Sequence, residues 1–480
     1  MPETKPSTAP PAQPPDARRH ARALRIGGLL ALTFLVIFGV VCVRKGWYEP
    51  PQPGESRKRK NRGTDFTAYY SAGELARTGR DLYDWRSSST PFRPYIYPPT
   101  FAILPMAPLS LLPHNAALAV FYWLNVGCLI GSLWLLRKML WPPGAESAGG
   151  FWRLPEVGLF VAVLMCGRFL DSNLKLGNAN LFILFFTTLG LYGLHRGRPF
   201  AGGLAIAYAT AVKATPGLFG LYFLWSRRGW AMTGGAVGLA LFLLIVPAAV
   251  LGWPQTAGSL RSFVDEAGAK FSMPVSSDAS DADADGEGDS EEGPRAIGVS
   301  LRGSLLKLLS PTVSMHHRDV GDVRSVNVLD LAPETVSRAA TILSLLILGL
   351  TIWLTAGSWA RTHPTGLALS WSLVTLTMLL ISPLTRKAHC VLVLIPAVVL
   401  IALLQQERLA GFARKAAWAA LAILPAATLL TAEGLAGERA AEFFHAMGTS
   451  TWAMVALYVA TAAALWSGKA SSDRSVRSDA

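Results

Sequence analysis

The chain has 480 residues, of which 51% are hydrophobic and 16% are charged, and its mean hydropathy is +0.35. Apolar runs close to membrane length recur along most of it, which excludes an ordinary soluble protein and predicts an all-α, polytopic membrane protein. The net charge of +13 does not indicate nucleic-acid binding, because the basic residues cluster beside the ends of apolar runs. The four cysteines show no spacing of a zinc site or a disulfide framework and are expected to be packing residues: Cys42, Cys128, Cys166 and Cys390.

The N-terminal segment 1–22 starts with a run rich in Pro, Ala and Thr and is predicted to be a disordered cytoplasmic tail. A basic stretch and the apolar run 26–43 follow. That run is long and lacks a small-residue cleavage site, so we expect a retained signal anchor rather than a cleaved signal peptide. The membrane domain is expected to cover residues 23–467, and residues 468–480 are expected to form a cytoplasmic tail.

Apolar length predicts about twelve membrane spans. Their expected ranges are 26–43, 116–136, 156–170, 179–195, 200–212, 215–226, 230–252, 336–356, 365–383, 389–404, 413–432 and 451–467. When the spans alternate in direction, both termini and the main basic clusters fall on one side, which the positive-inside rule assigns to the cytoplasm. Those clusters lie near Arg137, Arg196, Arg227, Arg361 and Arg408.

Residues 200–225 are too short for two full spans. Pro216 removes a backbone donor and disfavours helix at Thr215, so we expect a helix pair that is broken near Lys213. A re-entrant segment is one form that such a pair can take. One long kinked helix is the alternative, and it would invert the sidedness of everything downstream.

Two large loops are then expected on the outer side, at 44–115 and 253–335. The first contains an apolar, proline-punctuated run at 97–113 that is too broken to span and is typical of a helix lying in the interface. The second contains an acidic low-complexity insertion at 276–293. Alternating aspartates resemble a cation loop, but no glycine-centred loop with a closing glutamate is present, which favours a solvated, disordered insertion over a calcium site.

Polar and charged residues gather near the outer ends of the predicted spans, where a charge at membrane depth costs at least ~2.5 kcal/mol and usually serves a site. They are Asp65, Asp171, Lys175, Asn178, Asn180, Lys213, Arg302, Arg386, Lys387 and His389. Taken singly, each has a structural alternative. Lys213 could be an interfacial lysine that snorkels to the membrane surface, and His389 could form an ordinary interhelical contact. The Arg386-Lys387 pair is also typical of interfacial anchors, and Asn178 and Asn180 are typical of helix caps.

Several short motifs occur in a characteristic order between residues 65 and 396. They are Asp65-Phe66-x-x-Tyr69-Tyr70, Ala72-Gly73, Leu82-Tyr83-Asp84, Tyr97-Pro98-Pro99, Pro108-Leu109, Leu112-Pro113, Gly177-Asn178-Ala179-Asn180, Lys213-x-x-Pro216, and Ser382-Pro383 with His389 and Pro396. Together they resemble glycosyltransferase family 87, the polyprenol-phosphate-mannose-dependent mannosyltransferases of the GT-C superfamily and their relatives. The chain departs from that pattern at Asn178, where glutamine is usual, and at Arg386-Lys387, where a tryptophan often precedes the histidine.

The resemblance implies a GT-C-type fold and an inverting transfer of a hexose, mannose by analogy, from a polyprenyl-phosphate donor to a lipid or glycan acceptor. Asp65 is the expected base. The donor phosphate is expected to contact Lys213, His389, Arg302, Arg386 and Lys387, and the sugar or acceptor to contact Tyr69, Tyr70, Trp85, Tyr97, Asn178 and Asn180. No metal or other cofactor is expected, since protein cations balance the leaving phosphate.

The expected location is the cytoplasmic membrane, with the site on its outer side and the protein a monomer. A transporter or flippase of a lipid-linked or anionic solute is the main alternative, because broken helices and intramembrane cations serve transporters too. A ligase that moves whole glycans from a lipid pyrophosphate is a third possibility. An outer-facing site with Asp65 at its edge favours the enzyme, whereas a mid-membrane site between two similar halves favours the transporter.

Overall fold

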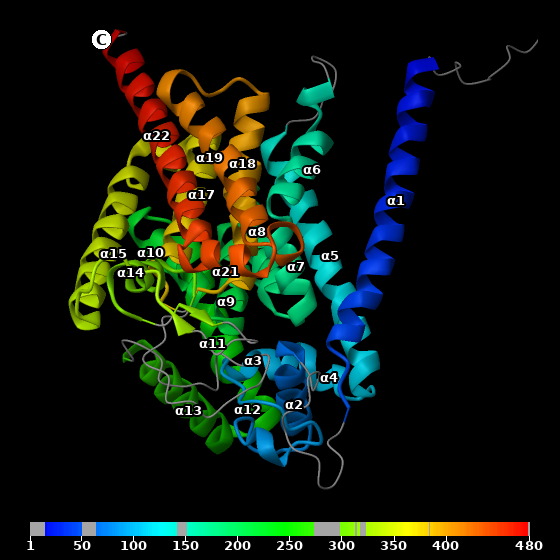
Figure 1. Ribbon diagram of the computed structural model, residues 1–480. Helices are drawn as coiled ribbons and strands as arrows, with labels where there is room; N and C mark the ends of the chain where they lie inside the picture. The colour runs from blue at the N-terminus through cyan, green and yellow to red at the C-terminus, as the bar shows by residue number, and fades with distance from the viewer. Residues whose placement is uncertain are drawn as a thin grey trace, which may run out of the picture.

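The computed structural model describes residues 15–49, 64–141, 151–272, 298–312, 314–316, 323–383 and 385–478. It is a bundle of helices with a smaller helical layer at one end (Figure 1). In the first half of the chain the elements are α1 (Pro15–Lys45), α2 (Asp65–Arg77), η1 (Trp85–Ser87), α3 (Pro99–Phe101), η2 (Ala102–Met106), α4 (Ala107–Leu109), α5 (His114–Leu140), η4 (Phe151–Arg153), α6 (Pro155–Met165), α7 (Gly167–Leu176), α8 (Asn180–His195), α9 (Pro199–Val212), η5 (Thr215–Gly217), α10 (Leu218–Trp225), α11 (Gly229–Ala240), η6 (Leu241–Ile245) and α12 (Val246–Leu251).

The second half continues with helices and one short antiparallel strand pair, in which Met315 is paired with Arg324. Its elements are α13 (Trp253–Ser272), α14 (Leu301–Leu309), β1 (Met315–His316), β2 (Val323–Arg324), α15 (Pro333–Thr355), α16 (Ser358–Thr362), α17 (Pro364–Ile381), η8 (Lys387–Val393), α18 (Leu394–Gln405), α19 (Gly411–Leu430), α20 (Glu433–Ala436), α21 (Glu438–Ala446) and α22 (Thr449–Ser478). The fold is therefore all-α in class, as predicted.

Each of the twelve predicted spans corresponds to a helix, but not all of these helices are long enough to cross a membrane alone. Within the described ranges, eight helices meet the length and hydropathy needed, and a ninth span results if α6 and α7, bent by 64°, are taken together. The helices α8, α9 and α10 are shorter. The multi-pass architecture is thus confirmed with fewer full spans, because the segments around the break at Lys213 end inside the protein.

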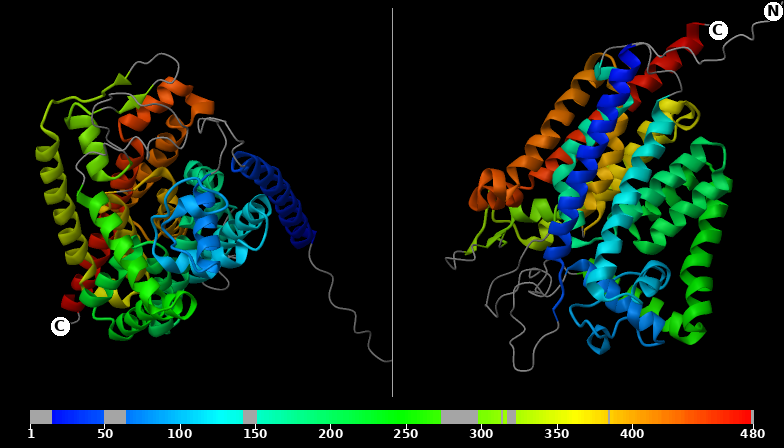
Figure 2. Two further views of the ribbon diagram at one scale, coloured as in Figure 1. Left: turned by 90° about the horizontal axis from the view of Figure 1, so that it is seen from below. Right: turned by 90° about the vertical axis from the view of Figure 1, so that its right-hand side faces the viewer.

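The hydrophobic core is centred on α17 and the continuous helix formed by η8 and α18. In the apolar window of η8 and α18, 94% of residues are buried, whereas the corresponding value for α1 is 11%. Figures 1 and 2 show α1 at the edge of the bundle, with its N-terminal end at the same end of the molecule as the C-terminal end of α22. An apolar helix that exposes most of its surface is suited to lipid rather than to water.

The basic loops gather at one end of the bundle, as the alternating topology requires. Arg137 at the end of α5 pairs with Glu156 on α6 at 2.9 Å. Arg153 in η4, just before α6, pairs at 2.6 Å with Glu407, which follows α18. At the same end, Arg228 Nη2 donates to the carbonyl of Arg361 at 2.8 Å.

The chain reverses direction at the break near Lys213, so Phe200 to Trp225 forms a helix pair and not one kinked helix. The helices α9 and α11 run parallel in close contact. An added Cβ on Gly234 would lie 2.1 Å from the carbonyl oxygen of Phe200, and one on Gly238 would lie 2.5 Å from the Cβ of Ala207. Parallel neighbours require the intervening chain to return to the starting end, and α10 makes that return.

The apolar run at 97–113 forms the short helix α3–η2–α4 and packs under α2, with Phe101 and Met106 fully buried. Helix α1 begins at Pro15, inside the segment expected to be a disordered tail, and α22 extends to Ser478, so the expected C-terminal tail is helical over most of its length. Residues 1–14 and the acidic insertion at 276–293 lie outside the described residues.

This arrangement predicts the sidedness of two exposed serines, Ser87 in the first loop and Ser358 at the start of α16. With the four native cysteines replaced by serine, Ser87→Cys should react with a membrane-impermeant maleimide on intact cells. Ser358→Cys should react only after permeabilisation, because it lies at the end with the basic loops. The opposite pattern would invert the assigned orientation, and labelling of both from outside would contradict the helix pair.

Candidate active site

Asp65 is the first residue of α2, where the free N–H groups and the dipole of a helix stabilise a carboxylate. The helix is held in place by its buried face, which includes Phe66 and Tyr69. Asp65 itself lies at the edge of this core, with 21% of its side chain exposed. The carboxylate is therefore fixed by the fold and still accessible to a ligand.

A tight turn between α7 and α8 brings two asparagines to Asp65. Gly177 ends α7 with a left-handed φ of 58°, and an added Cβ would lie 2.8 Å from the Cβ of Phe66, so this position requires glycine. Asn178 Nδ2 donates to Asp65 Oδ2 at 2.6 Å, and Asn180 Nδ2 donates to Asn178 Oδ1 at 2.6 Å. The turn thus orients the carboxylate from a segment 113 residues away.

The other carboxylate oxygen, Asp65 Oδ1, forms an ion pair with Arg93 Nη2. Arg93 lies between η1 and α3, and 23% of its side chain is exposed. Each oxygen of Asp65 thus accepts one charge-assisted or amide hydrogen bond and retains further acceptor capacity. A carboxylate held in this way is oriented to accept a proton from a hydroxyl group that approaches its exposed edge.

Two tyrosines lie close enough to Asp65 to feel its charge, and one of them contacts Lys213. Tyr69 donates its hydroxyl hydrogen to Tyr97 at 3.1 Å, and Lys213 Nζ lies 5.4 Å from the centroid of the Tyr97 ring. Burial, followed by the nearby Asp65 carboxylate, raises the pKa of Tyr97 to about 12. Tyr97 therefore remains a neutral hydrogen-bonding group at physiological pH.

Lys213 lies in the helix break, and the break directs its side chain toward the start of η8. Its backbone is extended, with φ of −157° and ψ of 130°, directly after α9 ends. Lys213 Nζ is 2.5 Å from His389 Nε2, and His389 Nδ1 accepts from the backbone N–H of Arg386 at 3.1 Å. Three segments that are distant in sequence therefore place Lys213, His389 and Arg386 together near Asp65.

The contacts of His389 fit an uncharged Lys213 in this arrangement. A backbone N–H can only donate, so Nδ1 is unprotonated and Nε2 of a neutral imidazole carries the hydrogen. Nε2 then donates to Lys213, whose amine accepts only when it is uncharged. Burial lowers the pKa of Lys213 to about 7, with Asp65 opposing and Arg386 adding to this effect, which is consistent with a neutral amine.

The remaining predicted site residues lie elsewhere or have other contacts. Tyr70 is buried, donates to the carbonyl of Leu112 at 2.8 Å and packs edge-on against His114. Arg86 stacks on Trp85, with 4.6 Å between the guanidinium carbon and the ring centroid. Arg302 Nη2 is 3.4 Å from Ser337 Oγ. The charge of Lys387 acts on a different set of residues, which is described below.

Two features of the site differ from the sequence-based reading. Asn178 and Asn180 do not cap a helix, because Ala179 is the N-cap of α8 and no side chain bonds there; their amides serve Asp65 and each other instead. Arg93 was not predicted at all. Its loop holds several other arginines, and the sequence offers no periodicity that singles out the one that folds back onto α2.

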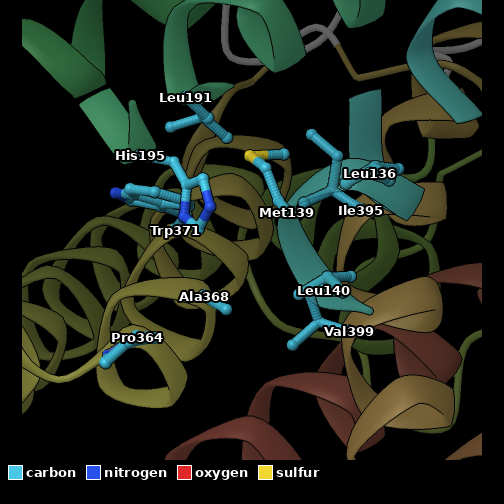
Figure 3. A pocket seen from close by; sticks show the side chains of 10 residues that line it. All are labelled: Leu136, Met139, Leu140, Leu191, His195, Pro364, Ala368, Trp371, Ile395 and Val399. Carbon is cyan, nitrogen blue, oxygen red and sulfur yellow. The ribbon is translucent and has the colours of Figure 1, made fainter. Parts of the chain in front are cut away.

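An apolar pocket lies away from this site, toward the end with the basic loops. Figure 3 shows its lining from α5, α8, α17 and α18, with the rings of His195 and Trp371 beside aliphatic side chains. It contains no fixed charge for a phosphate and is not the candidate active site. Within the described ranges, no group of three or more His, Cys, Asp or Glu side chains is arranged to hold a metal ion.

The contact from Asn178 yields a prediction. Asn178→Ala removes one donor from the carboxylate, and a hydrogen bond to a charged group is worth ~1.5–3 kcal/mol, so turnover should fall by about tenfold or more. Donor KM should change little, because the lost contact is to Asp65. Steady-state kinetics in detergent test this, with Asn178→Gln as the conservative variant expected to recover part of the activity. A variant with unchanged turnover would show that the amide does not position Asp65.

Part of the sequence is similar to a known protein family. Residues 95–286 match the model of Glycosyltransferase family 87. Over these residues, which are less than half of the chain, the protein is similar to that family. The family 87 region contains Tyr97, the turn with Asn178 and the break at Lys213, while Asp65 and His389 lie outside it and are joined to it by the contacts described above.

One similar curated protein is a polyprenol-phosphate-mannose-dependent alpha-(1-2)-phosphatidylinositol pentamannoside mannosyltransferase of Mycobacterium tuberculosis (strain CDC 1551 / Oshkosh), which is 24% identical over 247 residues. The match covers 51% of this chain and about half, 49%, of the length of that relative. Among solved structures, ArnT from Cupriavidus metallidurans in the apo state aligns with a TM-score of 0.39 and 13% identity, covering 92% of this chain and 77% of ArnT. ArnT bound to undecaprenyl phosphate aligns with a TM-score of 0.36 and 15% identity, covering 91% and 76%.

Proposed function

We propose that this chain is an inverting glycosyltransferase that moves a hexose from a polyprenyl-phosphate donor to a lipid or glycan acceptor, and that the hexose is mannose, as in the donor named for its curated relative. The observation that supports this most is that Asp65 lies close enough for its charge to act on Tyr97 and Lys213, while Lys213 contacts both the Tyr97 ring and His389. One acidic and several basic groups thus lie within one site. The family 87 region and the curated relative agree with this reaction class.

The proposed reaction needs a base and a place for a leaving phosphate. The acceptor hydroxyl oxygen attacks the anomeric carbon of the donor sugar from the face opposite the phosphate, and its proton passes to Asp65. The bond between that carbon and the phosphate oxygen breaks, and the electron pair leaves with the polyprenyl phosphate. Lys213, in its protonated form, and Arg386 then balance the additional negative charge on the phosphate. We propose that no metal ion is required.

The position of the site favours an enzyme over a transporter. Asp65 begins α2, Asn178 precedes α8 and Lys213 follows the last residue of α9, so the polar residues meet at helix ends. The basic loops lie at the other end of the bundle, as their ion pairs show. We propose that the site faces the outer side of the cytoplasmic membrane, where a lipid-linked donor is reached from the bilayer, and that the protein acts as a monomer.

The anomeric configuration of the product tests this mechanism. With a donor of known configuration, NMR of the isolated product should show the opposite configuration at the transferred carbon, because a single displacement inverts it. Retention would require a covalent or double-displacement route and would remove Asp65 from the role of base. Uptake of labelled donor into proteoliposomes without any covalent transfer would support the transporter instead.

A further inference from the structure

A second group of basic side chains lies apart from the Asp65 site, and four different elements contribute to it. Arg168 comes from α7, Lys307 from α14, Lys387 from the start of η8 and His445 from α21. Helix α7 packs against η8, and α14 packs against α21, so these elements bring the four side chains into one region. Burial, followed by Lys387, Lys307 and Arg168, holds the pKa of His445 well below its usual value, and burial with Lys387 lowers the pKa of Lys307 to about 8.

The hydrogen bonding of this basic cluster is incomplete. Lys307 is 3% exposed, and its Nζ donates to the carbonyl of Gly298 at 2.9 Å, which occupies one of three donors. The buried atoms Arg168 Nε and His445 Nδ1 have no hydrogen-bond partner among the described residues. Buried polar atoms are normally paired, and an unpaired one costs ~1–3 kcal/mol. A ligand with several acceptor oxygens would satisfy Arg168 Nε and the remaining donors of Lys307, and it would accept from His445 in the tautomer that carries the hydrogen on Nδ1.

The acidic residues near the cluster do not neutralise it. Asp171 is shared between Arg168 Nη1 at 2.8 Å and Lys175 Nζ at 2.6 Å. Glu433 is a second carboxylate near the cluster, and its charge acts on Lys387. In the part of the chain that the structure describes, neither Lys307 nor Lys387 forms an ion pair with a carboxylate. The surplus of positive charge is typical of a site for an anion.

Consecutive residues at the start of η8 separate this cluster from the Asp65 site. The charge of Arg386 acts on Lys213, His389 and Tyr97. The charge of Lys387 instead acts on Lys307 and His445 and is itself affected by Arg168. Two consecutive residues therefore supply one cation each, Arg386 to the Asp65 site and Lys387 to the second basic cluster. Lys387 is not needed to explain the donor phosphate contacts.

We propose that Arg168, Lys307, Lys387 and His445 form a second anion site, which binds the phosphodiester group of an anionic membrane lipid. A lipid is favoured over a soluble anion because the surrounding elements border apolar surface. Helix α21 exposes 43% of Phe443, and α15, which packs against α14, exposes 62% of Leu345. In Figure 1, α7, α14 and α21 lie at a similar level of the bundle, above the layer that contains α2. This proposal does not depend on sugar transfer.

Lipid titration of the full-length protein tests the site. Delipidated protein in neutral detergent is titrated with phosphatidylglycerol, and bound lipid is counted by native mass spectrometry while the unfolding temperature is followed. Wild type should bind the lipid and gain stability. Lys387→Gln should raise the apparent Kd several-fold, and the double variant Lys307→Gln with Lys387→Gln by about tenfold or more, as expected for lost charge-assisted hydrogen bonds.

Lys138→Gln is the matched control, because Lys138 is exposed at the opposite end of the bundle and should leave lipid binding unchanged. If the double variant does not fold, Lys387→Gln alone decides, since the Lys387 side chain makes no hydrogen bond to a described residue and its loss should cost little stability. Equal lipid affinity in wild type and Lys387→Gln would overturn the site. Equal protection of wild type by inorganic phosphate at the same concentration would overturn the assignment to a lipid.

Discussion

Replacement of Asp65 by asparagine should lower the rate of sugar transfer by at least about 100-fold, which is the contribution that general-base catalysis typically makes. The amide keeps the size of the side chain and can still contact Arg93 or Asn178, but it no longer accepts the proton. Donor binding should survive, because our proposal assigns the phosphate contacts to Lys213 and Arg386. Removal of a carboxylate near an anionic donor is expected to leave the affinity equal or somewhat higher.

The matched control for this variant is Asp81→Asn. Asp81 is an exposed carboxylate in the same outer loop, where its Oδ1 accepts from the backbone N–H of Tyr83 at 3.1 Å. It should retain wild-type turnover. An Asp65→Asn protein that folds normally and transfers sugar at the wild-type rate would end the assignment of Asp65 as the base.

Lys213 should make donor binding depend on pH, with affinity falling as the pH rises through about 7. Burial lowers the pKa of Lys213 to about 7 in the free protein, with Asp65 opposing and Arg386 adding to the shift. Below that pH the ammonium form is available to the donor phosphate, and above it the amine is neutral and accepts from His389. The phosphodiester of the donor keeps one negative charge across this range. Lys213 is therefore the partner whose charge changes with pH before the two bind. Donor KM should therefore be lowest on the acid side of neutrality.

Two substitutions separate charge from structure at this position. Lys213→Ala should raise donor KM by about tenfold to 100-fold at pH 6 and also lower turnover, since the lost contact is to the leaving phosphate. Lys213→Arg keeps a charge that does not titrate in this range, so its donor KM should vary less with pH. A wild-type KM that is independent of pH from 6 to 9 would show that Lys213 does not contact the donor phosphate.

The membrane architecture could be predicted from the sequence because its cause is physical and local. A helix such as α5 must be long and apolar to cross a bilayer, and Pro216 cannot continue a regular helix, so both features are visible in the residues themselves. The number of full spans was less predictable. Helices α8 to α10 are apolar like the others, and only their packing around the break shows that they are shortened.

The contacts of the site depend on tertiary structure, which local patterns do not report. Asn178 resembles a helix cap in sequence, yet Gly177 turns the chain so that its amide reaches Asp65. Arg93 reaches the same carboxylate because its loop folds over α2. Arg386 and Lys387 look like one anchor pair, but the extended backbone before η8 sends their charges to different neighbours. The order of the motifs predicted Asp65, Lys213 and His389 as site residues. Their contact partners could be identified only from the folded structure.

The most direct test of the central proposal is a transfer assay with purified full-length protein in lipid nanodiscs. A panel of polyprenyl-phosphate donors, each with a different radiolabelled hexose, is incubated with a lipid extract of the native membrane as acceptor, and products are separated from donor by chromatography. We expect label to move from one donor, the mannose donor by preference, to a new glycolipid or glycan, and Asp65→Asn to abolish this within detection. Absence of transfer from every donor, with wild-type protein that is folded and binds polyprenyl phosphate, would contradict the assignment as a glycosyltransferase.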